Sequence, residues 1–160
     1  MNNEQIIRLI KILKQNNFTI SSCETFTGGM FANMITNIAS SSSVFRGSLI
    51  GYTNQFKKDI IGVKQSLIKQ QGIHSEKVAL KMAYLTKSLT KSNMAVSFVG
   101  NPYPTFGDKQ KTRYCYIAIV FDNDDYIVSR IETSTIKSIE DFKTYAVKIA
   151  IKKIIKGLSD

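Results

Sequence analysis

Helix-like and strand-like hydrophobic patterns alternate along this chain, and no other feature of the sequence restricts the possible folds so strongly. Alternation of this kind places helices against the faces of a sheet. It therefore predicts the α/β class: a three-layer α/β/α sandwich with a mixed sheet, formed by a single domain over residues 1–160. In the first half of the chain we expect a strand at 18–23, a helix that opens at 27–29, a strand near 46–53, and before them a helix with one apolar face at Ile6, Ile7, Ile10 and Leu13.

The second half of the chain continues the alternation and ends in a hairpin and a helix. Ser75 suits a helix N-cap, and the helix after it is expected to bury a stripe of residues at spacings of four, three and four. The apolar runs 114–121 and 126–133 flank the turn-forming residues DNDD, which predicts an antiparallel hairpin. A last helix over about 138–156 is expected to stop at Gly157. The stripe after Ser75 comprises Val78, Met82, Leu85 and Leu89, and a strand should follow at 94–99.

Length and hydropathy indicate one compact domain that does not enter a membrane. The chain has 160 residues, 43% of them hydrophobic, which is enough for a single buried core. Its longest apolar run, 114–121, is far shorter than the roughly 20 residues that span a bilayer. The N-terminus lacks the order of charge, apolar core and cleavage site that marks a signal peptide. We therefore expect a cytoplasmic protein with no membrane partner.

The net charge of +10 raises the alternative that the chain binds nucleic acid or another polyanion. The basic residues are dispersed, however, and no nucleic-acid-binding motif is recognisable. A nucleic-acid partner is therefore not expected, although a positive surface would also attract an anionic mononucleotide. The densest basic group surrounds the last helix away from its apolar stripe, as in an ordinary solvated helix face, and comprises Lys143, Lys148, Lys152, Lys153 and Lys156.

Cysteine and histidine are too few for a metal site. Cys23 and Cys115 form no spaced ligand or disulfide pattern, so they are expected to be buried free thiols. His74 is the only histidine, which excludes a multi-histidine site. We interpret it as an exposed residue before a helix cap and not as a catalyst.

Residues 42–57, SSVFRGSLIGYTNQFK, contain the strongest candidate for chemistry. They place Ser42, Tyr52 and Lys57 around one predicted strand. A lysine beside a tyrosine favours loss of a proton from one of the two, so the three residues together form a candidate nucleophile and base. The alternative from the residues alone is a loop serine, a packed tyrosine and a surface lysine.

Three segments of the sequence resemble the CinA C-terminal domain family, the nicotinamide-nucleotide amidohydrolases. TISSCETFTGG at 19–29 is similar to a strand followed by the family's E-S-C-T-G-G. SSSVFRGSLIGYTNQFKKDIIGV at 41–63 resembles A-S-x-V-F-x-G-G-V-x-x-Y-S-N-E-A-K-x-x-x-L-G-V. QQGIHSEKVALKMA at 70–83 resembles H-G-A-V-S-E-E-V-A-x-x-M-A, in which an apolar residue usually stands where this chain has His74.

The resemblance implies a reaction and a set of catalytic residues. It assigns catalysis to Ser42, Tyr52 and Lys57, and the alignment decides which residue of 40–43 is the serine. The implied reaction is hydrolysis of the carboxamide of nicotinamide mononucleotide to nicotinic acid mononucleotide and ammonia, without a metal or an organic cofactor. Either Ser42 attacks the amide, or Tyr52 and Lys57 activate a water. The resemblance also implies a homodimer.

Two further segments are expected to bind the nucleotide substrate. The turn at 24–29 lies between a strand and a helix, where free backbone N–H groups suit a phosphate. The alternative is that a threonine caps the helix and that the carboxylate of Glu24 is satisfied by the turn itself. The expected substrate-binding residues are Glu24, Thr25, Thr27, Gly28 and Gly29 from this turn, with Ser97, Gly100 and Asn101 from AVSFVGNPYPTFGDKQKTRYCYIAI at 95–119, which resembles the family's glycine-rich motif A-V-T-G-I-A-G-P-G-G.

The chain also departs from the family at its binding loops. Thr25 and Phe26 replace a serine and a cysteine, and the ring of Phe26 is expected to narrow the ligand pocket. Ile139 and Lys143 replace arginines. A second hypothesis is therefore a catalytically degenerate CinA-like binding or regulatory module. In the glycine-rich motif, which starts at residue 95, the usual glycines are replaced by Phe98, Asn101, Tyr103 and Pro104.

Overall fold

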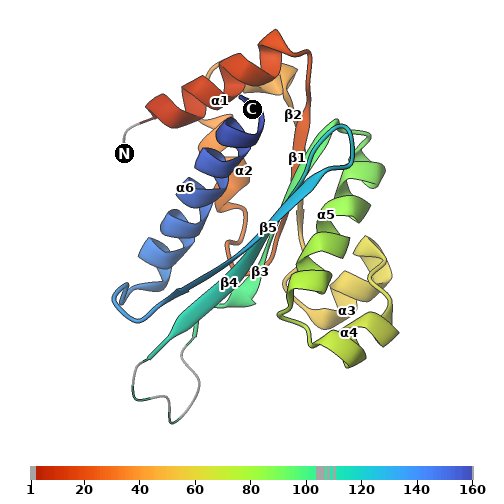
Figure 1. The fold of residues 1–160 in the computed structure, drawn as a ribbon, viewed down its shortest axis with the longest axis vertical. Helices are drawn as coiled ribbons and strands as arrows, with labels where there is room; N and C mark the ends of the chain where they lie inside the picture. The colour runs from red at the N-terminus through yellow and green to blue at the C-terminus, as the bar shows by residue number, and fades with distance from the viewer. Residues whose placement is uncertain (1–2, 104–106, 108, 110, 160) are drawn as a thin grey trace.

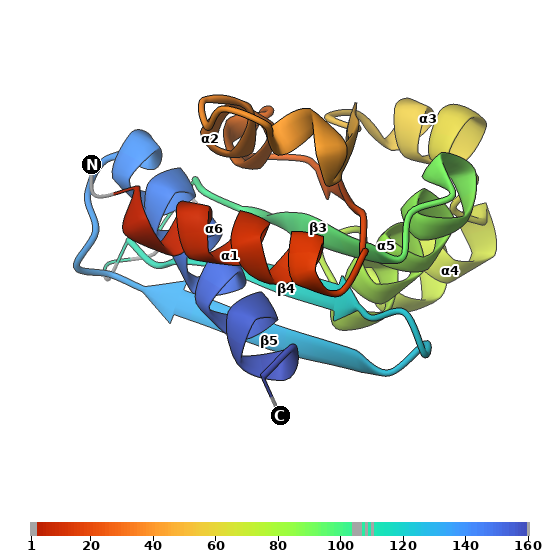
Figure 2. The same cartoon turned by 90° about the horizontal axis from the view of Figure 1, so that it is seen from above.

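A mixed five-stranded sheet with helices on both faces forms the fold (Figures 1 and 2), as the α/β prediction requires. The computed structural model describes residues 3–103, 107, 109 and 111–159. The strand order is β2-β1-β3-β4-β5, with β1 parallel to β2 and β3, and with β4 antiparallel to β3 and β5. In chain order the elements are α1 Glu4–Gln15, β1 Ile20–Glu24, α2 Met30–Thr36, η1 Ser41–Ser43, β2 Phe45–Ile50, α3 Asn54–Phe56, η2 Lys57–Ile61, α4 Gln65–Gln71, α5 Glu76–Thr90, β3 Met94–Asn101, β4 Arg113–Val120, β5 Tyr126–Thr133 and α6 Ile139–Gly157.

Two apolar cores lie on opposite faces of the sheet. Helices α1, α2 and α6 cover one face and contribute residues such as Leu13, Phe31 and Ile151, which are almost fully buried. Helix α5 covers the other face with the short helices before it, and buries Met82 there. Figure 1 shows α6 and α5 on either side of the strands. In the described part of the chain, no helix combines the length and apolarity needed to cross a membrane.

The predicted helix stripes are wrong at individual positions. Ile7 is 52% exposed, and Leu9 takes its place in the buried face of α1. In α5, Leu89 is 57% exposed and Leu85 is only half-buried. Ala79 and Ala83 let α5 approach the sheet closely, so small residues lie at the centre of its buried face. The spacing of the leucines did not predict this. The buried residues of α5 are Val78, Ala79, Met82, Ala83 and Thr86.

The last helix ends at Gly157, as predicted, and Gly157 is its final residue. A Cβ atom at Gly157 would lie only 2.4 Å from Cζ of Phe121. The glycine therefore permits close packing between α6 and the end of β4, which explains its place inside a helix. The sequence also gave no indication of the short helices η1, α3, η2 and α4 that connect β2 to its neighbours.

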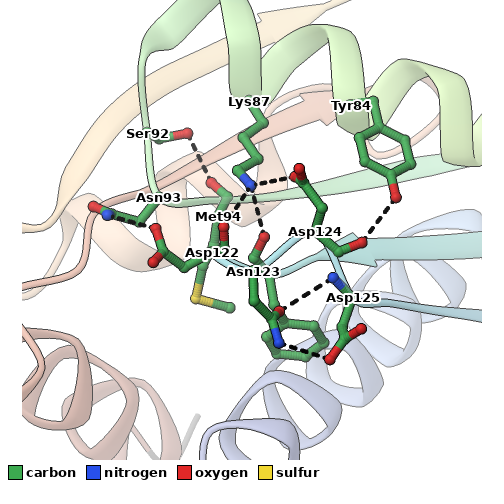
Figure 3. Close-up of polar contacts among 10 residues, drawn as sticks. Tyr84, Lys87, Ser92, Asn93, Met94, Asp122, Asn123, Asp124 and Asp125 are labelled. Carbon is green, nitrogen blue, oxygen red and sulfur yellow. Dashed lines mark hydrogen bonds and ion pairs between the residues drawn. The ribbon is translucent and has the colours of Figure 1, made fainter.

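The predicted hairpin of β4 and β5 is confirmed, and its turn is attached to α5. Arg113 pairs with Thr133 at the open end of the hairpin. Near the turn, Nζ of Lys87 donates to the carbonyl oxygens of Phe121 at 2.7 Å and Asp122 at 3.1 Å. Figure 3 shows these contacts together with the ion pair to Asp124 at 2.7 Å. One lysine of α5 thus holds both the backbone and a side chain of the turn.

We expect Lys87→Met to lower the free energy of unfolding by about 1–3 kcal/mol, because hydrogen bonds from a charged donor are lost at a partly buried site. Lys77→Met on the exposed side of α5 is the matched control, with an expected change below about 0.5 kcal/mol. Urea unfolding measures both variants. Equal stability of Lys87→Met and the wild type would contradict this account of the turn.

Candidate functional site

A small pocket opens at the carboxyl ends of β1 and β3, the edge at which open α/β sheets commonly bind ligands. Its volume is about 210 Å³. The strand ends, the turn η2 and the loop before α5 all reach it, so segments far apart in the sequence meet there. The pocket is lined by Thr25, Phe26, Tyr52, Lys57, His74, Gly100, Asn101, Pro102 and Tyr103.

A larger hollow of about 720 Å³ lies at the other end of the sheet, beside the turn between β4 and β5. Its charged lining consists of Asp122, Asp124 and Asp125. Their turn is already held by Lys87, which gives these carboxylates a structural role. We therefore place the candidate site in the smaller pocket, where a buried cation and perturbed pKa values occur together.

Lys57 is the most unusual residue of the pocket, because its side chain is charged in water but only 2% exposed here. It is the first residue of η2, a π-helical turn that follows directly on α3. The side chain of Thr53 accepts a hydrogen bond from the backbone N–H of Phe56 and so fixes the start of α3. No described residue accepts a hydrogen bond from the Lys57 ammonium or forms an ion pair with it. Burial accordingly lowers the pKa of Lys57, and nearby Cys23 opposes this only in part.

Tyr52 lies at the mouth of the pocket and is 64% exposed. The neighbouring hydroxyl of Tyr103 raises the pKa of Tyr52 above its ordinary value. A tyrosine that acts as a base needs the opposite shift, since it must lose its proton. Of the two proton losses that the pair could favour, ionisation of Tyr52 is therefore not supported, whereas burial does lower the pKa of Lys57. Both residues border the same pocket.

Ser42 is not brought to this pocket. It is exposed in η1, before β2 begins, whereas Tyr52 and Lys57 follow the end of β2. At about 3.3 Å per strand residue, β2 separates Ser42 from Tyr52 by roughly 20 Å. The other serines of 40–43 occupy the same end of the sheet. The grouping of Ser42 with Lys57 within one chain is therefore wrong, because residues at opposite ends of one strand cannot meet.

The carboxylate of Glu24 is fully used inside the protein. Glu24 is completely buried at the end of β1. Its oxygens accept hydrogen bonds from the first turn of α2 and from the hydroxyls of two serines. The alternative that the turn itself satisfies the Glu24 carboxylate is thus correct. These backbone N–H groups of α2 are not free to bind a phosphate. The donors are the backbone N–H groups of Gly29 at 3.1 Å, Phe31 at 3.1 Å and Ala32 at 3.0 Å, and Oγ of Ser22 and Ser48, both at 3.3 Å.

Thr25 supplies a hydroxyl to the pocket that contains Lys57. Its Oγ1 donates a hydrogen bond to the carbonyl oxygen of Phe98 at 2.8 Å, and its backbone N–H donates to the same oxygen at 3.1 Å. These bonds link the ends of β1 and β3 and hold the side chain in place. Thr25 occupies the serine position of the family's E-S-C-T-G-G and was expected from the sequence only to bind substrate.

Phe26 does not fill the pocket as expected. It borders the pocket, but the side chain is only 4% exposed and its ring stacks on Phe142 of α6 at 5.5 Å between centroids. Phe98, another departure from the family, packs on Phe31 at 5.7 Å. The added aromatic volume thus lies in the core beneath the helices.

The remaining residues expected to bind substrate lie in three different places: an open hollow, the contact between α5 and the sheet, and the pocket that contains Lys57. Thr27, Gly28 and Gly29 line a separate open hollow beside Lys143. Ser97 is fully buried, and its hydroxyl donates to the carbonyl oxygen of Ala79 in α5 at 2.6 Å. Its side chain therefore serves packing of the helix on the sheet.

Gly100 and Asn101 do border the pocket. A Cβ atom at Gly100 would lie 2.4 Å from the carbonyl oxygen of Tyr114, so the glycine is required by the approach of β3 to β4. The Asn101 side chain accepts a hydrogen bond from the backbone N–H of Tyr103 at 3.0 Å. Pro104, the last departure in this motif, lies outside the described residues.

His74 directly precedes the helix cap Ser75, as predicted, but it lines the pocket and is not exposed. It is half-buried, and its ring meets that of Tyr114 edge-on at 6.4 Å between centroids. Burial and, to a smaller extent, the charge of Lys57 lower the pKa of His74. The sequence offered one hint, since a histidine stands at a usually apolar family position.

Metal ligands are not grouped anywhere in the described part of the chain. No cluster of three histidine, cysteine, aspartate or glutamate residues could hold an ion there. Cys23 and Cys115 are buried free thiols, as predicted, and burial raises the pKa of each to about 12. The pocket is thus an α/β carboxyl-edge site built on a lysine, a histidine and hydroxyl groups.

Known proteins share both this fold and this sequence pattern. The family model described as the CinA C-terminal domain matches residues 3–158. A CinA-like protein of Thermotoga neapolitana is 33% identical over 112 residues, which cover 69% of this chain and 28% of that protein. A CinA-like protein of Prochlorococcus marinus is 36% identical over 134 residues, which cover 82% of this chain and 31% of that protein. The chain belongs to the CinA C-terminal domain family.

Solved structures agree with this assignment. The competence/damage inducible protein of Agrobacterium tumefaciens superposes with a TM-score of 0.88 at 26% identity, over 99% of this chain and 95% of that one. A competence damage-inducible protein of Klebsiella pneumoniae has a TM-score of 0.87 at 17% identity, over 98% of this chain and 96% of that one, and shows the same fold. The chain spans less than a third of the length of the two curated relatives named above. Self-association and a cytoplasmic location stay predictions.

Removal of the Glu24 carboxylate should destabilise the protein strongly. Glu24→Ala leaves several backbone N–H groups of α2 without an acceptor, and each such buried group costs about 1–3 kcal/mol. We expect a loss of at least about 3 kcal/mol in urea unfolding, and a smaller loss for Glu24→Gln, which keeps one acceptor oxygen. Glu132→Ala is the control, because Glu132 forms an exposed pair with Arg130 and should change stability by less than about 1 kcal/mol. Similar losses for Glu24→Ala and Glu132→Ala would refute this role of Glu24.

Proposed function

We propose that this chain is an amidohydrolase that converts nicotinamide mononucleotide to nicotinic acid mononucleotide and ammonia. The observation that carries the proposal is Lys57, a buried lysine without a counter-ion that borders a small pocket at the carboxyl edge of the sheet. Keeping such a charge in the interior costs stability. Residues of this kind are therefore candidates for a functional role. The resemblance to nicotinamide-nucleotide amidohydrolases includes this lysine and supports the substrate.

Amide hydrolysis needs a nucleophilic oxygen and groups that move protons. The hydroxyl of Thr25 borders the same pocket as Lys57, so we assign the attacking oxygen to Thr25 in place of Ser42. The oxygen must lose its proton when it attacks, and the amide nitrogen must gain one before it leaves as ammonia. Lys57 is suited to proton transfer, because burial brings its pKa closer to the working pH.

The size of the pocket determines how a substrate would fit. A volume of about 210 Å³ is below the roughly 300–1,000 Å³ of ordinary ligand sites. We therefore infer that only the nicotinamide group enters, while the ribose and phosphate stay outside among the basic side chains of the surface. The resemblance implies no metal or organic cofactor, and these steps need none.

The same small volume favours a second candidate function, a CinA-like module that binds a ligand without turning it over. The replacement of the family's serine by Thr25 also favours it, since a threonine carries an extra methyl group at the reacting atom. The two functions differ in whether Lys57 affects chemistry or only binding, and a lysine variant separates them.

Lys57→Met should abolish ammonia release from nicotinamide mononucleotide. Loss of a proton-transfer group typically costs roughly 10²–10⁴ in rate, and methionine preserves the shape of the side chain. A coupled ammonia assay measures kcat and KM for the wild type, Lys57→Met and the control Lys64→Met, in which an exposed lysine is lost. Wild-type rates in Lys57→Met would sink the catalytic assignment. Binding without turnover by the wild type, seen by calorimetry, would favour the binding module.

The same variant should be more stable than the wild type at neutral pH. The pKa of Lys57 is lower in the folded protein than its ordinary value of 10.5, so the unfolded chain binds the proton more tightly. At low pH, the buried Lys57 ammonium lowers the free energy of unfolding of the wild type by its full amount. This loss of stability disappears as the pH rises toward 10.5. Thermal unfolding of both proteins at several pH values should show a gain for Lys57→Met that shrinks with rising pH. A gain independent of pH would contradict the lowered pKa.

A further inference from the structure

The pocket contains a second proton-transfer group that the proposed function does not use. His74 lies in the loop between α4 and α5, directly before the Ser75 that caps α5. It borders the same pocket of about 210 Å³ as Lys57 and Thr25. Imidazole is the side chain whose ordinary pKa is closest to neutral pH, and it is the commonest general base in enzymes.

The ring of His74 contacts the sheet. It meets the ring of Tyr114 in β4 edge-on, with 6.4 Å between centroids. The guanidinium carbon of Arg130 in β5 lies 5.3 Å from the centroid of the same tyrosine ring. The contacts of Arg130 with Tyr114 and of Tyr114 with His74 connect β5 and β4 to the pocket.

The charges around His74 favour a neutral imidazole. No described residue that lines the pocket is a carboxylate, so no anion is present there to hold an imidazolium. Burial and, to a smaller extent, the positive charge of Lys57 lower the pKa of His74, which favours the neutral ring. The titratable and charged groups around the ring are Lys57 of η2, Tyr52 after β2, Tyr103 after β3, Tyr114 of β4 and Arg130 of β5, with exposed Glu76 two residues along in α5.

A single lysine would have to begin the reaction as an amine in order to accept a proton, and then donate that proton as an ammonium. We propose that this chain divides the work: His74 is the general base and Lys57 is the general acid of the same pocket. The inference rests on the proposed function and assigns the two directions of proton transfer to two residues.

The imidazole takes the proton of the Thr25 hydroxyl while the oxygen forms a bond to the amide carbon, and the Lys57 ammonium stabilises the resulting oxyanion. When the C–N bond breaks, Lys57 gives its proton to the nitrogen, which leaves as ammonia. Water then attacks the threonine ester and gives a proton to solvent, and the imidazolium returns its proton to the Thr25 oxygen as the ester breaks. Lys57 regains a proton from solvent.

The first test does not depend on activity. His74 is the only histidine, so in tag-free protein the imidazole signals in ¹H–¹⁵N NMR belong to it alone. We expect His74 to titrate below the ordinary 6.5, and to titrate at higher pH in Lys57→Met, because the neighbouring charge is removed. Lys64→Met is the control and should leave the titration unchanged. An unchanged His74 titration in Lys57→Met would overturn the pairing.

The second test is the pH dependence of kcat/KM for nicotinamide mononucleotide. The wild type should lose activity at low pH, where His74 is protonated, and again at high pH, where Lys57 loses the proton that it must donate. At pH 7, His74→Val and His74→Asn should both lose roughly 10²–10⁴ in rate, and their residual rate should rise with pH as the Lys57 amine forms.

The outcomes of the second test separate a base from other roles. Wild-type rates and an unchanged profile in His74→Asn would overturn the assignment, and so would a rise in KM alone in His74→Val, which marks a wall of the pocket. A wild type that releases no ammonia would refute the proposed function and the catalytic step with it. The NMR titration would still decide whether His74 and Lys57 interact.

Discussion

The buried carboxylate of Glu24 is the interaction on which the candidate site depends. It accepts hydrogen bonds from the start of α2 and from Ser48 of β2, and so joins three elements at the end of β1. Thr25 follows directly, bonded to Phe98 of β3, so its hydroxyl is fixed at the pocket. The turn that looked like a phosphate site in the sequence is instead an internal support, because its N–H groups already have a negatively charged partner.

This support allows an otherwise unfavourable group to be kept nearby. Lys57, at the start of the π-helical turn η2, is buried, and no described residue forms an ion pair with it. The fold therefore carries a local loss of stability at the carboxyl edge of the sheet. Such an arrangement is common at functional sites, where chemistry and stability make opposite demands. His74 adds a second titratable group to the same pocket.

Features set by local sequence were predictable. The DNDD hairpin and the Ser75 cap depend on a few adjacent residues, and the structure contains both. The family could be recognised from three ordered segments. Features that depend on tertiary contacts were missed: proximity in sequence suggested that Ser42 and Lys57 meet, yet a strand carries its two ends to opposite edges of the sheet. The place of Phe26 in the core could not be inferred either, since it depends on Phe142 of α6.

The central claim is that the chemistry belongs to the pocket at the carboxyl edge, with Thr25 as its hydroxyl. The most direct test measures ammonia release from nicotinamide mononucleotide by Thr25→Val and Ser42→Ala side by side with the wild type. Valine keeps the shape of threonine and removes only the hydroxyl, while Ser42 is exposed at the other edge. We predict that Thr25→Val loses at least about 10²-fold in kcat and that Ser42→Ala retains the wild-type rate. Loss of activity in Ser42→Ala with full activity in Thr25→Val would contradict the account.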